Sequence, residues 1–165
     1  MNGAPARFHV SGLDADTVYH WRVTTGSDEI TGRCRTFPTQ GRPSSVRIVG
    51  GSCAQTDSEA STFDRMRDQD AHVFIHMGDL HYLDIESSDV DEHRQGIRDV
   101  LASSTQSEFY RHTPIAYVHD DHEWGPHDTD GTEDGRDEFL QAYREMVPHY
   151  PLPETDTPNK QPAHA

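Results

Sequence analysis

Two apolar stretches of this chain end abruptly in side chains that can bind metals. In the first, residues 73–77 lead into Gly78 and Asp79, and His81 and Tyr82 follow closely. A buried strand that delivers a carboxylate at its C-terminal end is a common way for α/β proteins to build a metal site. Such a carboxylate could bridge two cations about 3.5–4 Å apart, as in two-metal hydrolases. The alternatives are a helix or turn cap for Asp79 and ordinary packing for Tyr82.

The second stretch, residues 115–118, runs into the polar segment 119–123, which holds Asp120, Asp121, His122 and Glu123. Three carboxylates beside one imidazole repel one another unless a cation or an arginine neutralises them. His122 could donate a proton to a leaving oxygen, or its charge could stabilise a transferred phosphoryl group. Together the two strand ends predict a bimetallic site in a hydrolase of phosphate esters. A solvated acidic loop is the alternative.

Three further positions bear on this site. Cys53 follows an expected strand and two glycines, which let the backbone turn tightly beneath a ligand. Its thiolate could bind a transition metal, and a buried, inert cysteine is the alternative. His127 and Asp128 lie a turn beyond the second cluster and offer additional ligands. His76 stands inside an apolar strand, which favours a packing role over a metal-binding one.

The elements that must position these residues follow from the apolar pattern. Residues 46–50, 71–77 and 114–118 predict strands, and residues 59–68 predict a helix between the first two. The order strand, helix, strand with short connections implies parallel strands and a right-handed crossover.

The remaining segments alternate between helix and loop. Residues 84–111 predict a polar helical excursion and residues 136–146 a helix with one buried side. The segment 125–135 is rich in Gly and Asp and predicts a loop. No regular structure is expected beyond Pro148.

The N-terminal part has a different pattern. Residues 7–39 alternate in the β manner and predict three short strands, over 8–10, 19–24 and 30–37. Three such strands bury little core alone and are typical of the end of a β-sandwich. A Pro- and Gly-rich linker over 38–45 follows. We therefore expect two domains, residues 1–40 and residues 45–165.

Composition excludes several function classes. The formal net charge is −15 and Lys160 is the only lysine, so bulk electrostatics will not bind nucleic acid. The acidic surface also fits a high-salt environment, and simple solubility is the plainer explanation. Two cysteines make no disulfide framework. No apolar run is long enough for a membrane span, and residues 1–7 lack the apolar core of a signal peptide.

In combination these motifs resemble the PhoD-like alkaline phosphatases and phosphodiesterases of the calcineurin-like metallophosphoesterase superfamily. The resemblance extends from about residue 8 to 150 and rests on the segments 51–55, 76–82, 118–126 and 144–148. Residues 8–39 look like the end of the fibronectin-type sandwich that often precedes the catalytic domain. Leu13, Thr17 and Tyr19 fit its Leu-x-x-x-Thr-x-Tyr corner.

The resemblance implies an α/β fold, a partial metallophosphoesterase βαβ sandwich preceded by the last strands of the fibronectin-type domain. It also implies a small phosphate ester or phosphodiester as substrate and divalent or trivalent metal ions as cofactors, with iron and calcium expected. Members of the family are often exported. The sequence leaves the localisation, the oligomeric state and the choice between mono- and diesters open.

The resemblance also assigns roles to particular residues. Asp79 would bridge from the iron site to the second site, and His122 would be the catalytic histidine. Asp121 and His122 fall where the superfamily has an Asn-His pair, while many relatives have Asn at the place of His127. The expected metal ligands are Cys53, Asp79, Tyr82, Asp121 and His127.

The chain departs from the superfamily at both ends. The superfamily uses further metal-binding His and Asp residues, whereas residues 148–165 offer only His149 and His164 in no such motif. A complete sandwich needs about seven strands. We therefore expect a piece of a longer enzyme that carries half of the metal site. The rival hypotheses are an inactive remnant or metal-binding module without catalysis and, from segment 128–137, an acidic calcium-binding surface, which lacks the ligand spacing of a calcium loop.

Overall fold

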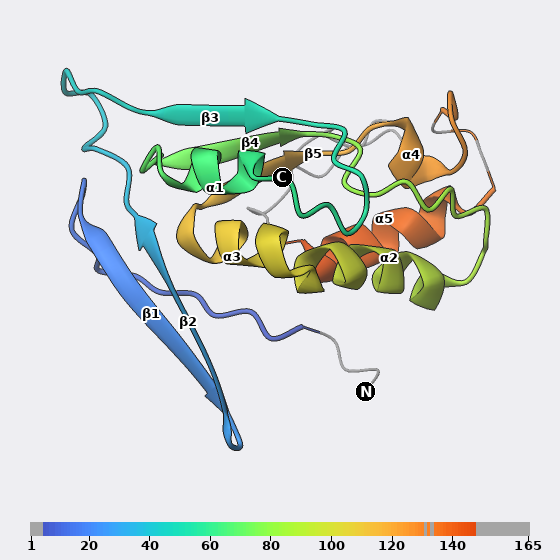
Figure 1. Ribbon diagram of the computed structural model, residues 1–165, viewed down its shortest axis with the longest axis horizontal. Helices are drawn as coiled ribbons and strands as arrows, with labels where there is room; N and C mark the ends of the chain where they lie inside the picture. Colours follow the sequence, from blue (N-terminus) through green and yellow to red (C-terminus); the bar gives the residue numbers. More distant parts are fainter. Residues whose placement is uncertain (1–4, 131, 133, 148–165) are drawn as a thin grey trace.

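The computed structural model describes residues 5–130, 132 and 134–147. Its centre is a parallel sheet of β3 (Ile48–Gly51), β4 (Val73–Met77) and β5 (Ile115–Val118), in that order. Helices α1 (Thr62–Arg67), α2 (Val90–Ala102), α3 (Ser104–His112) and α5 (Arg136–Met146) lie on one face of this sheet (Figure 1). The predicted α/β architecture with parallel strands is confirmed.

The core lies between the sheet and these helices. Parallel strands place paired residues on the same face, and Phe74 and Tyr117 point toward the helices. Phe74 packs with Phe63 of α1 and Phe109 of α3, and Tyr117 packs with residues of α2 and α5. On the opposite face, Ile48 and Met77 are about half-exposed.

Helix boundaries follow local capping chemistry. The expected excursion over 84–111 divides into α2 and α3, which meet at Ser103. The Asp89 side chain caps α2 by accepting a 2.9 Å hydrogen bond from the Asp91 backbone N–H. The helix predicted over 136–146 is confirmed as α5. The helix expected over residues 59–68 is shorter in the structure, where α1 begins at Thr62 and ends at Arg67.

The predicted pair of strands before the linker forms an antiparallel hairpin, β1 (Val18–Thr25) and β2 (Asp28–Arg35). The strand predicted over residues 8–10 is wrong, since this segment has no regular structure. Phe8 and Val10 are largely exposed, and among the described residues the segment pairs with no strand.

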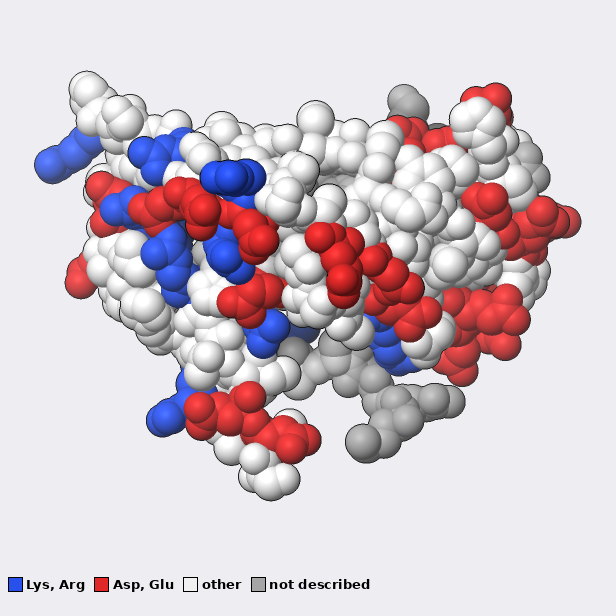
Figure 2. Space-filling view, viewed as in Figure 1, with Lys and Arg blue, Asp and Glu red and all other residues white. Residues whose placement is uncertain are grey.

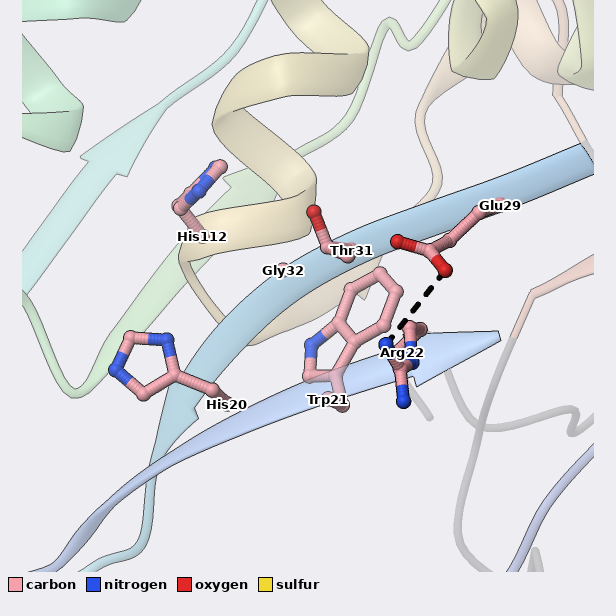
Figure 3. Close-up of a pocket in the computed structure, with 7 residues that line it drawn as sticks. All are labelled: His20, Trp21, Arg22, Glu29, Thr31, Gly32 and His112. Atoms are coloured by element: carbon pink, nitrogen blue, oxygen red, sulfur yellow. Dashed lines mark ion pairs between the residues drawn. The ribbon is translucent and has the colours of Figure 1, made fainter. Parts of the chain in front are cut away.

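The hairpin contacts the rest of the chain at the end of α3. The Trp21 ring lies across Gly32, and a Cβ at Gly32 would collide with this ring and with the Arg111 carbonyl (Figure 3). Arg33 and Arg35 of β2 both pair with Asp70, just before β4.

Surface charge is unevenly distributed on the face seen in Figure 2. Acidic side chains spread over the whole face, including the end that holds α2, α4 and α5, and most of the basic side chains lie among acidic ones at the opposite end. Within the described ranges, none of the helices combines the length and apolar character needed to cross a membrane. The segment expected to lack regular structure, beyond Pro148, lies outside the described residues.

Candidate metal centre

The end of β4 turns sharply at Gly78 and Asp79. Their φ angles are +93° and +54°, in the left-handed region that glycine and, less readily, aspartate adopt. A Cβ at Gly78 would lie 2.5 Å from the Asp120 Cβ, so only glycine allows the ends of β4 and β5 to approach this closely. The turn thereby brings Asp79 next to the segment that follows β5.

Glu123 holds these two strand ends together. Its side chain is fully buried and accepts hydrogen bonds from the backbone N–H groups of Asp79 (3.2 Å), Leu80 and Asp120 (2.6 Å). Burial raises the pKa of Glu123 to about 7, against the effect of these donors. Glu123 was grouped by the sequence with the carboxylates of Asp120 and Asp121. Its side chain instead accepts hydrogen bonds from the backbone and is no part of that cluster.

A short helix orients Glu123. Helix α4 (Asp121–Trp124) has a capping box, in which the Asp120 side chain accepts from the helix backbone and Glu123 accepts from the Asp120 N–H. This helix was not predicted, although Asp-x-x-Glu is a sequence signature of the capping box. It turns Glu123 inward and leaves Asp121 and His122 beside Asp79.

Asp79 is the centre of the first half of the site. It is 6% exposed, and its Oδ2 accepts a 2.8 Å hydrogen bond from the Tyr82 hydroxyl and a 3.2 Å one from the Cys53 thiol. Its Oδ1 is buried without a hydrogen-bond partner among the described residues. A buried carboxylate oxygen without a partner is costly, and a cation at this point would satisfy it.

The protonation of Tyr82 fits this picture. Burial, together with the neighbouring Cys53 and Asp79, raises the pKa of Tyr82 far above its usual value when no cation is bound. A cation reverses this effect, because it stabilises the phenolate as a ligand. The cluster of thiol, carboxyl and phenol groups is therefore suited to a metal ion and is poorly stabilised without one.

The second half of the site is more open. Ligand atoms of Asp121, His122 and His127 lie within 4.8 Å of one another, and those of Asp79, Asp120 and Asp121 form a second such group. Asp79 and Asp121 are therefore close enough to connect the two halves. His127 is mostly exposed, with its Nδ1 3.6 Å from Asp121 Oδ2, which accepts a 2.6 Å bond from the Asp128 N–H.

His122 pairs with a carboxylate that the sequence did not indicate. Its Nδ1 lies 2.7 Å from Asp84 Oδ1, and its ring lies 4.3 Å from that of Tyr82, measured between centroids. Partial burial lowers the pKa of His122, but the hydrogen bond to Asp84 and the charges of Asp121 and Asp79 raise it above its ordinary value overall. His122 is thus held in one orientation and biased toward the positively charged form.

Comparisons with known proteins bear on the fold. The sequence matches no protein-family model, and it matches none of the curated proteins at a significant level. A solved structure described as PhoD superposes with a TM-score of 0.69 at 19% sequence identity, over 92% of this chain and 35% of that one. The chain has a PhoD-like fold. It spans about a third of the length of that protein. The similarity therefore shows the fold alone, and any function must be argued from the residues of this chain.

The structure thus brings together the five expected metal ligands and His122. Cys53 and Tyr82 meet at Asp79, while Asp121, His122 and His127 form the adjoining group. His81, the other residue of the first motif, instead packs in the core against Gly96 of α2. The sequence did not indicate Asp84, because no local pattern connects this residue with His122. It also placed Glu123 among the site carboxylates, whereas the Glu123 side chain binds backbone N–H groups.

Proposed function

We propose that this chain is part of a metal-dependent phosphoesterase that acts on small phosphate mono- or diesters. The observation that carries the proposal is the environment of Asp79. One of its oxygens is shared by a thiol and a phenol, the other is buried without a partner among the described residues, and its carboxylate lies within 4.8 Å of ligand atoms of Asp120 and Asp121. This arrangement fits a carboxylate that bridges two cations.

The donor types favour two different metals. Cys53, Asp79 and Tyr82 would hold iron, since thiolate and phenolate are ligands of transition metals. Asp79, Asp121 and His127 would complete a second site, in which the carboxylate oxygens suit calcium and the imidazole suits a transition metal. When bound, such a pair of metals polarises the phosphoryl oxygens and supplies a nucleophilic water or hydroxide at neutral pH.

The chain's own residues contribute to binding and charge. His122, held in one orientation by Asp84, would donate a hydrogen bond to the transferred phosphoryl group and so stabilise its negative charge. Glu123 would keep Asp79 and Asp120 at a fixed separation through its backbone hydrogen bonds. The PhoD-like fold supports this function, and because the chain spans only 35% of that protein, further groups of the whole enzyme can take part.

Metal binding can be tested directly by spectroscopy. A tyrosinate bound to ferric iron has a visible charge-transfer band, so addition of iron to the purified protein should produce one. Tyr82→Phe should abolish the band, and Tyr110→Phe, at a tyrosine of α3 outside the centre, should leave it unchanged. A band that survives Tyr82→Phe would remove Tyr82 from the ligand set.

Catalysis needs a separate test. Hydrolysis of a nitrophenyl phosphodiester should fall by more than about a hundredfold with Asp79→Asn, because even outer-shell partners of metal ligands contribute about 10- to 100-fold. Asp99→Asn, in helix α2 and outside the candidate centre, is the matched control. Full activity in Asp79→Asn would make the assignment wrong. Metal binding without any hydrolysis would favour the alternative, a metal-binding module without catalysis.

A further inference from the structure

The loops that follow β3 and β4 carry the first half of the candidate metal centre. Cys53 lies on the first loop, whereas Asp79 and Tyr82 lie on the second. Between the end of β4 and the start of α2, residues 78–89 form neither helix nor strand. The position of Tyr82 therefore depends on contacts that individual residues of this segment make with the rest of the chain.

Different groups hold the start and the middle of the second loop. The Glu123 carboxylate accepts hydrogen bonds from the backbone N–H groups of Asp79 and Leu80. The Tyr82 N–H instead donates a 3.1 Å hydrogen bond to the hydroxyl oxygen of Thr56. Thr56 is half-buried and belongs to the loop after β3. A side chain of the first loop therefore holds the backbone of Tyr82 in the second.

Thr56 is itself part of an anchored turn. The Ser58 N–H donates a 2.9 Å hydrogen bond to the Gln55 carbonyl, and this bond closes a turn around Thr56. The same carbonyl lies 3.5 Å from Nε2 of Gln106, a fully buried residue of α3. A hydroxyl group on such a turn can fix a neighbouring loop, because its own backbone has little freedom.

Two hydrogen bonds between the loops enclose the cluster of thiol, carboxyl and phenol groups. Next to the sheet, the Cys53 N–H donates a 3.3 Å bond to the Gly78 carbonyl. Further along both loops, the Tyr82 N–H bonds to Thr56. Between these two bonds, Asp79 Oδ2 accepts from the Cys53 thiol and the Tyr82 hydroxyl. The two bonds thus set the separation of the three side chains that would share one metal ion.

We propose that Thr56 is a positioning residue of the metal centre, whose hydroxyl oxygen holds the Tyr82 backbone so that the phenol oxygen lies against Asp79 and can bind iron beside it. Thr56 acts through Tyr82 and is not itself a ligand. A half-buried N–H group that loses its acceptor is costly, so without the hydroxyl the loop would shift until water reaches this group, and the phenol would move with it. The part of the inference that concerns iron rests on the proposed function.

The first test needs neither metal nor turnover. Thr56→Val removes the acceptor at nearly constant shape, and Thr56→Ser retains it. Amide hydrogen exchange is measured by NMR on the ¹⁵N-labelled, metal-free protein. The Tyr82 N–H should exchange about tenfold faster in Thr56→Val than in the wild type, as the loss of one hydrogen bond implies, and Thr56→Ser should behave like the wild type. The Leu80 N–H, which Glu123 holds, is the internal reference and should change much less.

The second test measures the effect on the metal. Groups that orient metal ligands contribute about 10- to 100-fold to metal affinity, so Thr56→Val should bind iron more weakly by a factor in this range. The tyrosinate-to-iron band should also shift in wavelength, because the phenol meets the metal in a different geometry. A merely destabilised fold would lower the affinity without moving the band. Thr56→Ser should restore both quantities, and Thr24→Val, at an exposed threonine of β1, is the matched control and should change neither.

The outcomes separate this inference from the proposed function. If the iron band forms and Thr56→Val changes neither the affinity nor the band, the inference is overturned while the proposed function stands. If the wild type forms no iron band, the proposed ligand set fails, and hydrogen exchange still decides whether Thr56 holds Tyr82. Faster exchange confined to the Tyr82 N–H then supports the inference. Unchanged exchange, or equal acceleration at Leu80, overturns it.

Discussion

The end of the sheet and the N-terminal hairpin are held in opposite ways. At the sheet end, the Gly78–Leu80 turn is fixed by a fully buried carboxylate and by a backbone approach that admits only glycine. The hairpin is attached at its periphery, where Arg33 and Arg35 pair with Asp70, whose side chain is 41% exposed. Val23 and Ile30 of the hairpin are exposed as well.

This difference follows from what each region must do. Buried hydrogen bonds to a charged group are strong and expensive to break, so they hold metal-binding side chains in one geometry. Exposed ion pairs contribute about 0–1 kcal/mol and allow the hairpin to shift at little cost. We therefore expect substitutions at the sheet end to affect the whole fold and substitutions at the hairpin to act locally.

Gly78→Ala should have the largest effect. The new Cβ would meet the Asp120 Cβ at 2.5 Å, so the ends of β4 and β5 must separate. We expect the free energy of unfolding to fall by about 3 kcal/mol, the sum of overpacking and left-handed backbone strain. Urea denaturation measures this loss.

Gly26→Ala in the hairpin turn is the matched control for this substitution. Its φ is +59° and its Cβ would have no neighbour within 4 Å, so only the backbone term of about 1 kcal/mol applies. If Gly78→Ala and Gly26→Ala lower the free energy of unfolding equally, the close approach of the ends of β4 and β5 does not contribute to stability.

Glu123→Gln should have the next largest effect. The amide group cannot accept as the carboxylate does, and its NH₂ would face backbone donors. We expect the free energy of unfolding to fall by about 2 kcal/mol, because hydrogen bonds to a charged acceptor are lost. Iron binding should also weaken, because Asp79 is no longer held in its fixed position. Glu92→Gln, on the exposed side of α2, should change neither quantity. Weakened iron binding without loss of stability would instead make Glu123 a ligand.

Gly32→Ala should act on the hairpin alone. A methyl group there would collide with the Trp21 ring and the Arg111 carbonyl, so the hairpin must move away from α3 (Figure 3). We expect Trp21 fluorescence to shift to longer wavelength as the ring becomes hydrated. In a Trp124→Phe background the signal comes from Trp21 alone, since the chain has two tryptophans. A loss of stability as large as that of Gly78→Ala would show that the hairpin is part of the cooperative core.

The same contrast explains what could be predicted from the sequence. The three parallel strands and α5 were predictable, because their apolar patterns match burial against a single core. The strand expected over residues 8–10 was wrong, because Phe8 and Val10 stay largely exposed and alternation alone does not make a strand.

Within the site, the meeting of Cys53, Asp79 and Tyr82 was predictable because these residues follow the ends of neighbouring parallel strands. The pairing of His122 with Asp84 was not, since it joins residues 38 positions apart across a loop. The inward orientation of Glu123 depends on the four-residue helix α4, which is too short to leave a periodic signal. Metal ligands at strand ends can therefore be predicted from the sequence. The side chains that orient these ligands cannot, because their positions depend on tertiary contacts.

Asp70→Asn should have the smallest effect and is sensitive to pH. Asn tolerates the left-handed backbone of Asp70, whose φ is +51°, so the substitution removes mainly the charge. The hydrogen bond from Arg33 lowers the pKa of Asp70 below 3.8. A carboxyl group with a lowered folded-state pKa stabilises the fold above its unfolded pKa, and this contribution disappears as the pH falls through the folded pKa.

The free energy of unfolding of Asp70→Asn should therefore be lower than that of the wild type by less than about 1 kcal/mol at pH 7. This difference, the gap, should disappear as the pH falls below about 4. Urea denaturation at a series of pH values measures the gap, with Asp68→Asn, at an exposed residue, as control. A gap that is independent of pH would mean that the charge of Asp70 does not hold the hairpin. Its attachment would then depend on the close approach of Gly32 to the Arg111 carbonyl of α3, and Gly32→Ala should release it completely.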